Sequence, residues 1–308
     1  MDRSDNVSVV NRPAAYAELL VDSTDRYDNG YPPVTGITTS SDWQTRLQQI
    51  VLNGYFTRLG VTQVQFHWNL PTIITGYNDQ FVVQVTAGAG VGVGSVTVPQ
   101  GYYTPTSLAA ALQGLLNAQP TVGAATWTVA FSALTGSFVL TVAGAGSVFN
   151  IFNNPNLRGK RFLETAGLQY FTSTPAATFT GNTPTMLPTK FVDICSTTLT
   201  KFQRVKDTTT LKNPTISNII ARIYPVAPNT RINVTGDTAL NESNSPGSFP
   251  FVICIDYNNP KWIKWSPEEA LSNFDLQLRD QNGNLLPFDT VNNAYGCEYQ
   301  LTIVASES

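Results

Sequence analysis

The residues that could carry chemistry in this chain are few and scattered. His67 is the only histidine among 308 residues, so a histidine-dependent catalytic triad elsewhere is impossible and a zinc site would need thiols gathered around it. The three cysteines, Cys195, Cys254 and Cys297, are too few and too far apart for a disulfide framework. We therefore expect His67 to be a structural surface histidine and the cysteines to be buried free thiols.

Two short motifs look like ligand-binding loops without matching one. Asp22, Asp25 and Asp28 precede Gly30, whereas an EF-hand loop places its ligands at alternate positions and ends on a distal Glu. The glycine run 88–94 is followed by a strand pattern, whereas a phosphate-binding loop needs a helix there. The sequence predicts an adventitious acidic stretch and a glycine-rich hairpin, with no metal or cofactor.

Composition excludes several function classes. Only 13% of residues are charged, and the net charge is −3, which argues against a nucleic-acid-binding surface because such surfaces gather Lys and Arg. The one basic cluster, Arg158, Lys160 and Arg161, is expected to be a solvated loop. The first residues lack the basic and apolar regions of a signal peptide, and no apolar stretch is long enough to span a membrane, so we expect neither a secretory signal nor a spanning helix. We expect synthesis in a cytosol.

Strictly alternating strands predict a mainly β protein. The C-terminal runs 249–257, 274–278 and 297–303 each place apolar side chains on one face, a pattern that buries one side of a sheet and exposes the other. Further strands are expected at 64–70, 191–195 and 218–224, and Asn282-Gly283 indicates a hairpin. About eight strands, the number in a jelly roll, predict a single antiparallel β-sandwich of that kind.

The middle of the chain combines strand patterns with a helix pattern. After a strand at 81–85, Thr104-Pro105 begins a helix whose leucines, from Leu108 to Leu116, have helical spacing, and two strands follow at 127–131 and 138–142. The order suggests a small α+β insertion. We expect an extended N-terminal arm at 1–40, a jelly roll at 41–86 and 181–308, and an inserted α+β domain at 87–180.

The C-terminal third resembles a known family. The segments 250–255 (PFVICI), 260–265 (PKWIKW) and 274–288 (FDLQLRDQNGNLLPF), with support from 196–208 and 218–224, are similar to the penton, or vertex, protein of icosahedral double-stranded DNA viruses whose major capsid protein is a double jelly roll. Virophages, polinton-like viruses and some larger relatives belong to this group. The resemblance is strongest over residues 190–305 and consists of strands and turns without a chemical signature.

The resemblance implies a structural capsid protein at the virion vertex. It implies an upright jelly roll, a homopentamer at each five-fold position, contacts with the major capsid protein and with minor or cement proteins, and an insertion that faces outward as a knob with a possible host-surface ligand. The arm would reach inward or toward neighbouring capsomers. Aromatic anchors are the candidate interface residues: Tyr16, Tyr27, Tyr31, Trp262 and Trp265. For Trp262 and Trp265 a core position is an equally good interpretation, because aromatic side chains serve both and spacing does not separate them.

Two alternatives come from other function classes. A receptor- or carbohydrate-binding β-sandwich, such as a spike or fibre head, would use loop aromatics, for which the candidates are Trp43, Trp262 and Trp265. A polysaccharide-acting enzyme on a jelly roll would need two carboxylates facing one cleft, and the first acids to test are Asp256, Asp275 and Asp280. Nothing in the spacing of the residues recommends a catalytic site, and we expect the chain not to be an enzyme.

Overall fold

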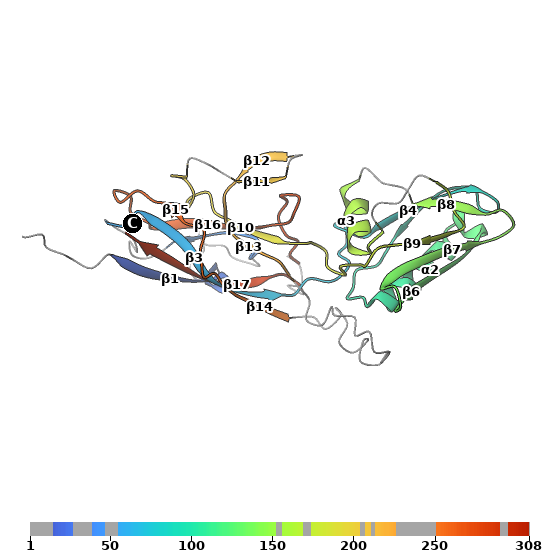
Figure 1. Cartoon of the computed structure of the whole chain (residues 1–308), viewed down its shortest axis with the longest axis horizontal. Helices are drawn as coiled ribbons and strands as arrows, with labels where there is room; N and C mark the ends of the chain where they lie inside the picture. Colours follow the sequence, from blue (N-terminus) through green and yellow to red (C-terminus); the bar gives the residue numbers. More distant parts are fainter. Residues whose placement is uncertain are drawn as a thin grey trace, which may run out of the picture.

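The fold is mainly β and antiparallel throughout the part of the chain that the structure describes. The computed structural model describes residues 15–26, 39–46, 55–151, 156–168, 174–203, 207–210, 213–225, 251–289 and 295–307. These residues form an elongated molecule with a β-sandwich at one end and a smaller mixed unit at the other (Figure 1). The predicted fold class, a mainly β jelly roll, is confirmed.

Two sheets make up the sandwich. The first has the order β1-β17-β3-β14, with the short β15 also paired to β3, and the second has the order β13-β10-β16-β2. The bounds in the first sheet are β1 (Tyr16–Asp22), β17 (Glu298–Ser306), β3 (Arg58–Trp68), β14 (Phe251–Asp256) and β15 (Ile263–Lys264). Those in the second sheet are β13 (Ile219–Ile223), β10 (Val192–Cys195), β16 (Asn273–Arg279) and β2 (Asp42–Arg46).

The strand order is that of a jelly roll. If the strands of the two sheets other than β15 are numbered one to eight along the described chain, the sheets read 1-8-3-6 and 5-4-7-2. Consecutive strands therefore lie in opposite sheets, except for β10 and β13, which pair directly in the second sheet. Both sheets contribute to one apolar core, in which Phe66, Trp68, Tyr299, Phe274 and Leu278 are buried. The faces predicted for the strands at 64–70, 274–278 and 297–303 are confirmed.

The sequence predicts an extended arm over residues 1–40, but part of this segment belongs to the sandwich. β1 pairs with β17 from Tyr16↔Ser306 to Asp22↔Gln300, so it is the first strand of the sandwich. Its alternate side chains, from Ala17 to Val21, pack against the core. The sequence does not predict this strand because Leu19, Leu20 and Val21 are consecutive apolar residues that break the alternation. Leu19 and Val21 face the core, whereas Leu20 is exposed. The remainder of the predicted arm lies largely outside the described residues.

Between β3 and β10 the chain builds a second unit, which we define as residues 73–186. Its own apolar core runs from Ile73 to Met186. One sheet has the order β5-β4-β8 and the other β6-β7-β9. The bounds are β4 (Gln80–Ala87), β5 (Gly92–Thr97), α2 (Pro105–Ala118), η2 (Val122–Ala124), β6 (Thr126–Ser132), β7 (Ser137–Ala143), β8 (Val148–Ile151), α3 (Leu157–Thr165) and β9 (Thr178–Thr180).

The predicted helix is present in this unit. Thr104 caps α2, and Leu108, Leu112 and Leu116 are buried. The predicted division of the chain into domains stays a prediction, but its boundary at residue 86 falls inside β4. Because β4 pairs with β5 and β8, and because Phe81, Val83 and Val85 pack in the second core, β4 belongs to the second unit. The remaining described elements are η1 (Ser23–Asp25), β11 (Asp207–Thr210) and β12 (Asn213–Ser217).

Candidate functional site

The tyrosines expected at an interface lie in the N-terminal segment, and the structure describes one of them. Tyr16 begins β1 at the edge of the first sheet, where its side chain is 63% exposed and its hydroxyl donates to Glu18. Tyr27 and Tyr31 lie outside the described residues. The side chain of Tyr16 is therefore accessible in the single chain, and its role at an interface stays a prediction.

The two tryptophans of the segment 260–265 have opposite environments. Trp262 is 37% exposed, and the guanidinium carbon of Arg58 lies 4.3 Å from its ring centroid. Trp265 is 2% exposed, packs edge-on against Phe202 and donates its Nε1–H to the carbonyl of Glu269. Trp265 is thus a core residue and offers no surface to a partner, whereas Trp262 remains available.

Two of the acids considered for catalysis, Asp275 and Asp256, have separate environments. Asp275 accepts hydrogen bonds from the backbone N–H groups of Thr197 (2.9 Å) and Thr198 (2.8 Å) and from the Thr197 hydroxyl (2.7 Å). Burial by itself would raise the pKa of Asp275, but these hydrogen bonds outweigh it and hold the pKa below its usual value. Asp256 is exposed at the end of β14. Asp275 therefore serves to fix the turn after β10.

Asp280 is the centre of the junction between the sandwich and the second unit. Its buried carboxylate forms an ion pair with the buried Arg161 of α3 and accepts a hydrogen bond from the Tyr77 hydroxyl at 2.8 Å. It also accepts from the backbone N–H groups of Asn282 and Asn284 in the predicted hairpin turn. Burial raises the pKa of Tyr77 well above its usual value, so this hydroxyl stays protonated and keeps donating.

The basic cluster is therefore not the solvated loop predicted for it. Arg161 also stacks on the Tyr77 ring at 3.8 Å, and Arg158 makes two 2.9 Å hydrogen bonds to the buried Asp79. Lys160 is exposed. The cluster lies on α3, whose turns direct two of its three cations inward against acids that are distant in sequence. Local charge density could not reveal those acids, because Asp280 is supplied by the turn after β16.

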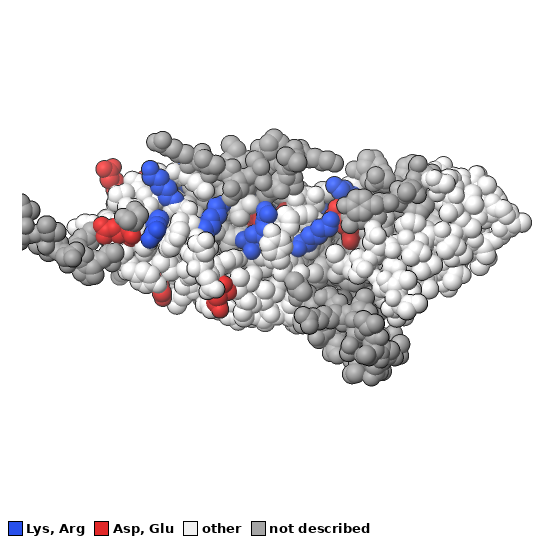
Figure 2. Space-filling view, viewed as in Figure 1, with Lys and Arg blue, Asp and Glu red and all other residues white. Residues whose placement is uncertain are grey.

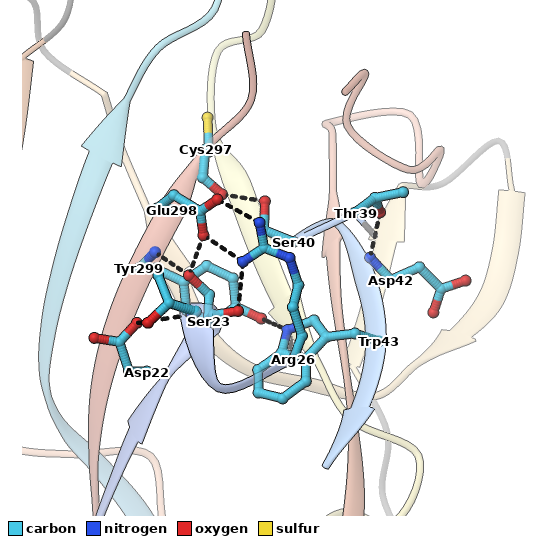
Figure 3. A network of polar contacts seen from close by, with 11 residues as sticks. Asp22, Ser23, Arg26, Thr39, Ser40, Asp42, Trp43, Cys297, Glu298 and Tyr299 are labelled. Atoms are coloured by element: carbon cyan, nitrogen blue, oxygen red, sulfur yellow. Dashed lines mark hydrogen bonds and ion pairs between the residues drawn. The ribbon is translucent and has the colours of Figure 1, made fainter. Parts of the chain in front are cut away.

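A second buried charge joins the N-terminal segment to the last strand (Figure 3). Arg26 donates to both carboxylate oxygens of Glu298, at 2.7 and 2.6 Å, and to the carbonyl of Ser23. The Ser23 hydroxyl donates to Glu298 and accepts from the N–H of Tyr299. The network clamps the end of β1 to the start of β17.

Trp43 of β2 belongs to the same region and is buried. Its Nε1–H donates to the Tyr299 hydroxyl at 2.8 Å, and burial raises the pKa of Tyr299 above its usual value. The Ser40 hydroxyl donates to the carbonyl of Cys297 in the same network (Figure 3). Trp43 therefore stabilises the sandwich, and it is not available as the carbohydrate-binding aromatic considered above.

His67 lies on the outer face of the first sheet. Its Nε2 is 3.4 Å from Nε2 of Gln65, and it lines an open depression of about 420 Å³ together with Asp22, Glu298 and Tyr295. Asp22 caps the turn Ser23–Asp25 by accepting from the backbone N–H of Thr24. Among the described residues, no group of three or more His, Cys, Asp or Glu side chains is placed to hold a metal ion.

The surface of the second unit is almost free of charge. From Gln80 to Leu157 the sequence contains no Asp, Glu, Lys, Arg or His. Figure 2 shows the consequence: in this view Lys and Arg side chains form a row along the sandwich, while the second unit beyond the junction is uncharged. Its outer β6-β7-β9 face carries hydroxyls instead, from Thr128, Thr141 and Thr178. This feature was readable in the sequence as a gap in the charge pattern.

Two of the three cysteines are buried, as predicted, and one is exposed. Cys195 and Cys297 are buried, and burial raises the pKa of each thiol to about 12. Cys254 is exposed, because it lies on the outward-facing side of β14 and alternates with the half-buried Ile253 and Ile255. The prediction of a buried thiol is therefore wrong for Cys254.

The thiols allow a direct test of this arrangement. In the folded protein at about pH 8, a maleimide is expected to modify one thiol per chain, because buried thiols are inert and only an accessible thiolate reacts. Mass spectrometry should assign the adduct to Cys254, and the Cys254→Ser variant should not react until it is denatured. Rapid native labelling of Cys195 or Cys297 would contradict the burial described here.

Comparison with known proteins found likeness in structure and none in sequence. No family model matches the chain, and no curated protein matches it. The mavirus penton protein is 12% identical, with a TM-score of 0.49, and the match covers 96% of this chain and 100% of that one. A chain of the Sputnik virophage is 14% identical, with a TM-score of 0.41, over 96% of this chain and 98% of that one.

Within the described residues, neither helix has the length and apolar character needed to cross a bilayer.

Proposed function

We propose that this chain is a structural capsid protein that forms the five-membered vertex ring of an icosahedral virus particle. The observation that carries the proposal is the jelly-roll strand order of its sandwich, 1-8-3-6 over 5-4-7-2. Jelly rolls are the building blocks of many viral capsids and of lectins. The likeness of residues 190–305 to vertex proteins favours the first of these uses.

The residues available on the surface also favour a capsid role over a lectin role. Of the three tryptophans that a carbohydrate-binding head would use, Trp43 and Trp265 are buried in the sandwich core. Two of the acids that an enzyme would use, Asp275 and Asp280, are occupied by turn and junction hydrogen bonds. That the chain is not an enzyme stays a prediction.

The elongated shape supports an upright placement in the particle. The sandwich lies at one end and the second unit projects from the other (Figure 1), so the sandwich can sit among capsid neighbours while the second unit faces outward. In this proposal the sandwich contacts the major capsid protein and minor or cement proteins, and the second unit, which has no charged residue from Gln80 to Leu157, is free to meet a host-surface ligand. The proposed location is the virion, and synthesis in the host cytosol stays a prediction.

The mass of the purified assembly tests the ring. Native mass spectrometry of the full chain is expected to give five times the mass of one chain, because a cyclic assembly closes at a fixed number of copies. A trimer would point instead to a fibre or spike head, and a monomer at every concentration would contradict the proposal.

The position in the particle is tested by electron microscopy of virions. Density for this chain is expected at the five-fold vertices. Density at three-fold or pseudo-six-fold positions would rule out the vertex role even for a chain that forms pentamers in solution.

A further inference from the structure

The two narrow sides of the sandwich differ: one carries an exposed leucine among carboxylates, and the other holds a cavity beside basic groups. We propose that neighbouring copies of this chain join through them, with the β1–β2 side of one copy packed against the β13–β14 side of the next. This inference rests on the proposed ring and names the surfaces that build it.

The first side presents exposed apolar side chains among carboxylates. On β1, Leu20 is 75% exposed and lies with Tyr16 and Glu18 on the outward face of this edge strand, where it lines a depression that continues onto Gln300 of β17. Asp22 ends β1, and the exposed Asp42 begins the adjacent edge strand, β2. An edge strand presents unpaired backbone groups, and soluble proteins usually cover or blunt such an edge.

The opposite side holds a depression that suits such a side chain. A cavity of about 400 Å³ opens between β13 and the end of β14. Apolar groups from Val61, Ile219, Ile220 and Ala221 line it, and Tyr224, Tyr257 and Asn259 lie around them. The Tyr257 hydroxyl donates to the carbonyl of Arg222 at 2.8 Å, so the wall of the cavity is fixed in the single chain.

Three basic groups lie around this cavity, beside one exposed carboxylate, Asp256, at the end of β14. Arg222 and Lys261 are among its lining residues, and the exposed Lys264 lies in β15, three residues beyond Lys261. Arg222 is also paired with the buried Asp193 of β10, at 2.6 and 2.9 Å, and the Lys261 ammonium donates to the carbonyl of Ile219. These contacts hold the cations in place beside the cavity, on a side that meets carboxylates in the proposed packing.

The sheet topology allows one copy of the chain to contact two neighbours at the same time, one through each side. β1 and β14 are the two edge strands of the first sheet, and β2 and β13 are the two edge strands of the second, within the described chain. The sides therefore lie at opposite ends of both sheets. A contact between two different patches of identical chains is heterologous, and its repetition gives a ring when the rotation between copies closes on itself.

Charge selects this pairing over a two-fold one. Packing the acidic side against its own copy would bring Glu18, Asp22 and Asp42 together, which like-charge repulsion opposes. Packing it against the side of Arg222, Lys261 and Lys264 places opposite charges together and lets Leu20 enter the cavity, where its apolar surface leaves water. The sheet face between the two edges is mostly amide, from Gln63, Gln65 and Gln300.

The first test uses matched leucine variants. Leu20→Asp is expected to raise the dissociation constant of the ring at least about tenfold, as measured by light scattering over a dilution series. Leu134→Asp is the control, because Leu134 is 97% exposed on the second unit, away from both sides. Tyr224→Ala, which removes a wall of the cavity, should act like Leu20→Asp. All three side chains are exposed, so the melting temperatures should match wild type.

The second test reverses charges. Glu18→Lys with Asp42→Lys, and separately Lys261→Glu with Lys264→Glu, are each expected to dissociate the ring, and the chain carrying all four changes should regain it. Lys160→Glu on α3 is the control and should leave the ring intact. Wild-type association should also weaken between about 0.05 and 0.5 M salt, because the interacting charges are screened.

The outcomes separate this inference from the proposed function. A wild-type pentamer that tolerates Leu20→Asp, Tyr224→Ala and both charge reversals would overturn the inference and leave the vertex ring standing. A wild-type chain that never associates would overturn the ring itself, and the inference with it. Loss of the ring in the side variants, with both controls intact, would support both.

Discussion

Replacing Asp280 with alanine is expected to lower the free energy of unfolding by about 3–5 kcal/mol, which would be one of the largest single-residue effects in the chain. The carboxylate is fully buried and neutralises the buried Arg161. Its loss leaves a guanidinium without its counter-charge, removes the acceptor of the Tyr77 hydroxyl, and frees the N–H groups of Asn282 and Asn284. Urea titration followed by circular dichroism measures the change.

An exposed ion pair provides the matched control. Lys201 and Glu269 also form a salt bridge, but both side chains are partly open to water, so Glu269→Gln should cost less than about 1 kcal/mol. If Asp280→Ala proved as mild as Glu269→Gln, the junction would not depend on the buried pair. Hydrogen exchange should then show no loosening of α3 relative to the sandwich.

Removing Glu298 is expected to cost more than removing its buried partner Arg26. Glu298→Ala leaves the Arg26 guanidinium buried without its counter-charge, at a cost of about 2–4 kcal/mol, reduced from that of a fully buried pair because water reaches part of Glu298. Arg26→Met should cost less, because an apolar chain of similar length then fills the site and the partly exposed carboxylate retains the Ser23 hydroxyl. Thermal unfolding of both variants measures the order.

A double variant separates charge from packing at this clamp. Arg26→Met combined with Glu298→Gln should recover much of the stability lost in Glu298→Ala, because no unpaired charge remains in the core. If the double variant were as unstable as Glu298→Ala, the geometry of the clamp and not its charge would hold β1 to β17.

Which of two similar tryptophans faces water was decided by the tertiary structure. Trp262 and Trp265 flank Ile263 and Lys264 in one short segment, and the sequence left core and interface equally open for both. β15 pairs with β3 at Ile263↔Leu59, which fixes the direction of each neighbouring side chain. Phe202, far from Trp265 in sequence, then completes the packing around it. Spacing alone cannot supply such a partner.

The buried ion pairs were hidden from sequence reasoning for the same reason. Arg161 looked like part of a solvated basic run because its acid, Asp280, is 119 positions away. Arg26 and Glu298 are separated by 272 positions. Local composition reports how many charges a segment carries, whereas the burial of a charge depends on whether a distant segment brings an acceptor to it.

The alternation of apolar and polar residues by itself determined the mainly β class and the inward faces of the strands at 64–70, 274–278 and 297–303, because side-chain direction along a strand is a local property with a period of two. The capping and leucine spacing of α2 were equally local. The choice of strand partners is not a local property. That β1 pairs with β17 and that β4 belongs to the second unit both follow from contacts between distant segments, which only the folded chain brings together.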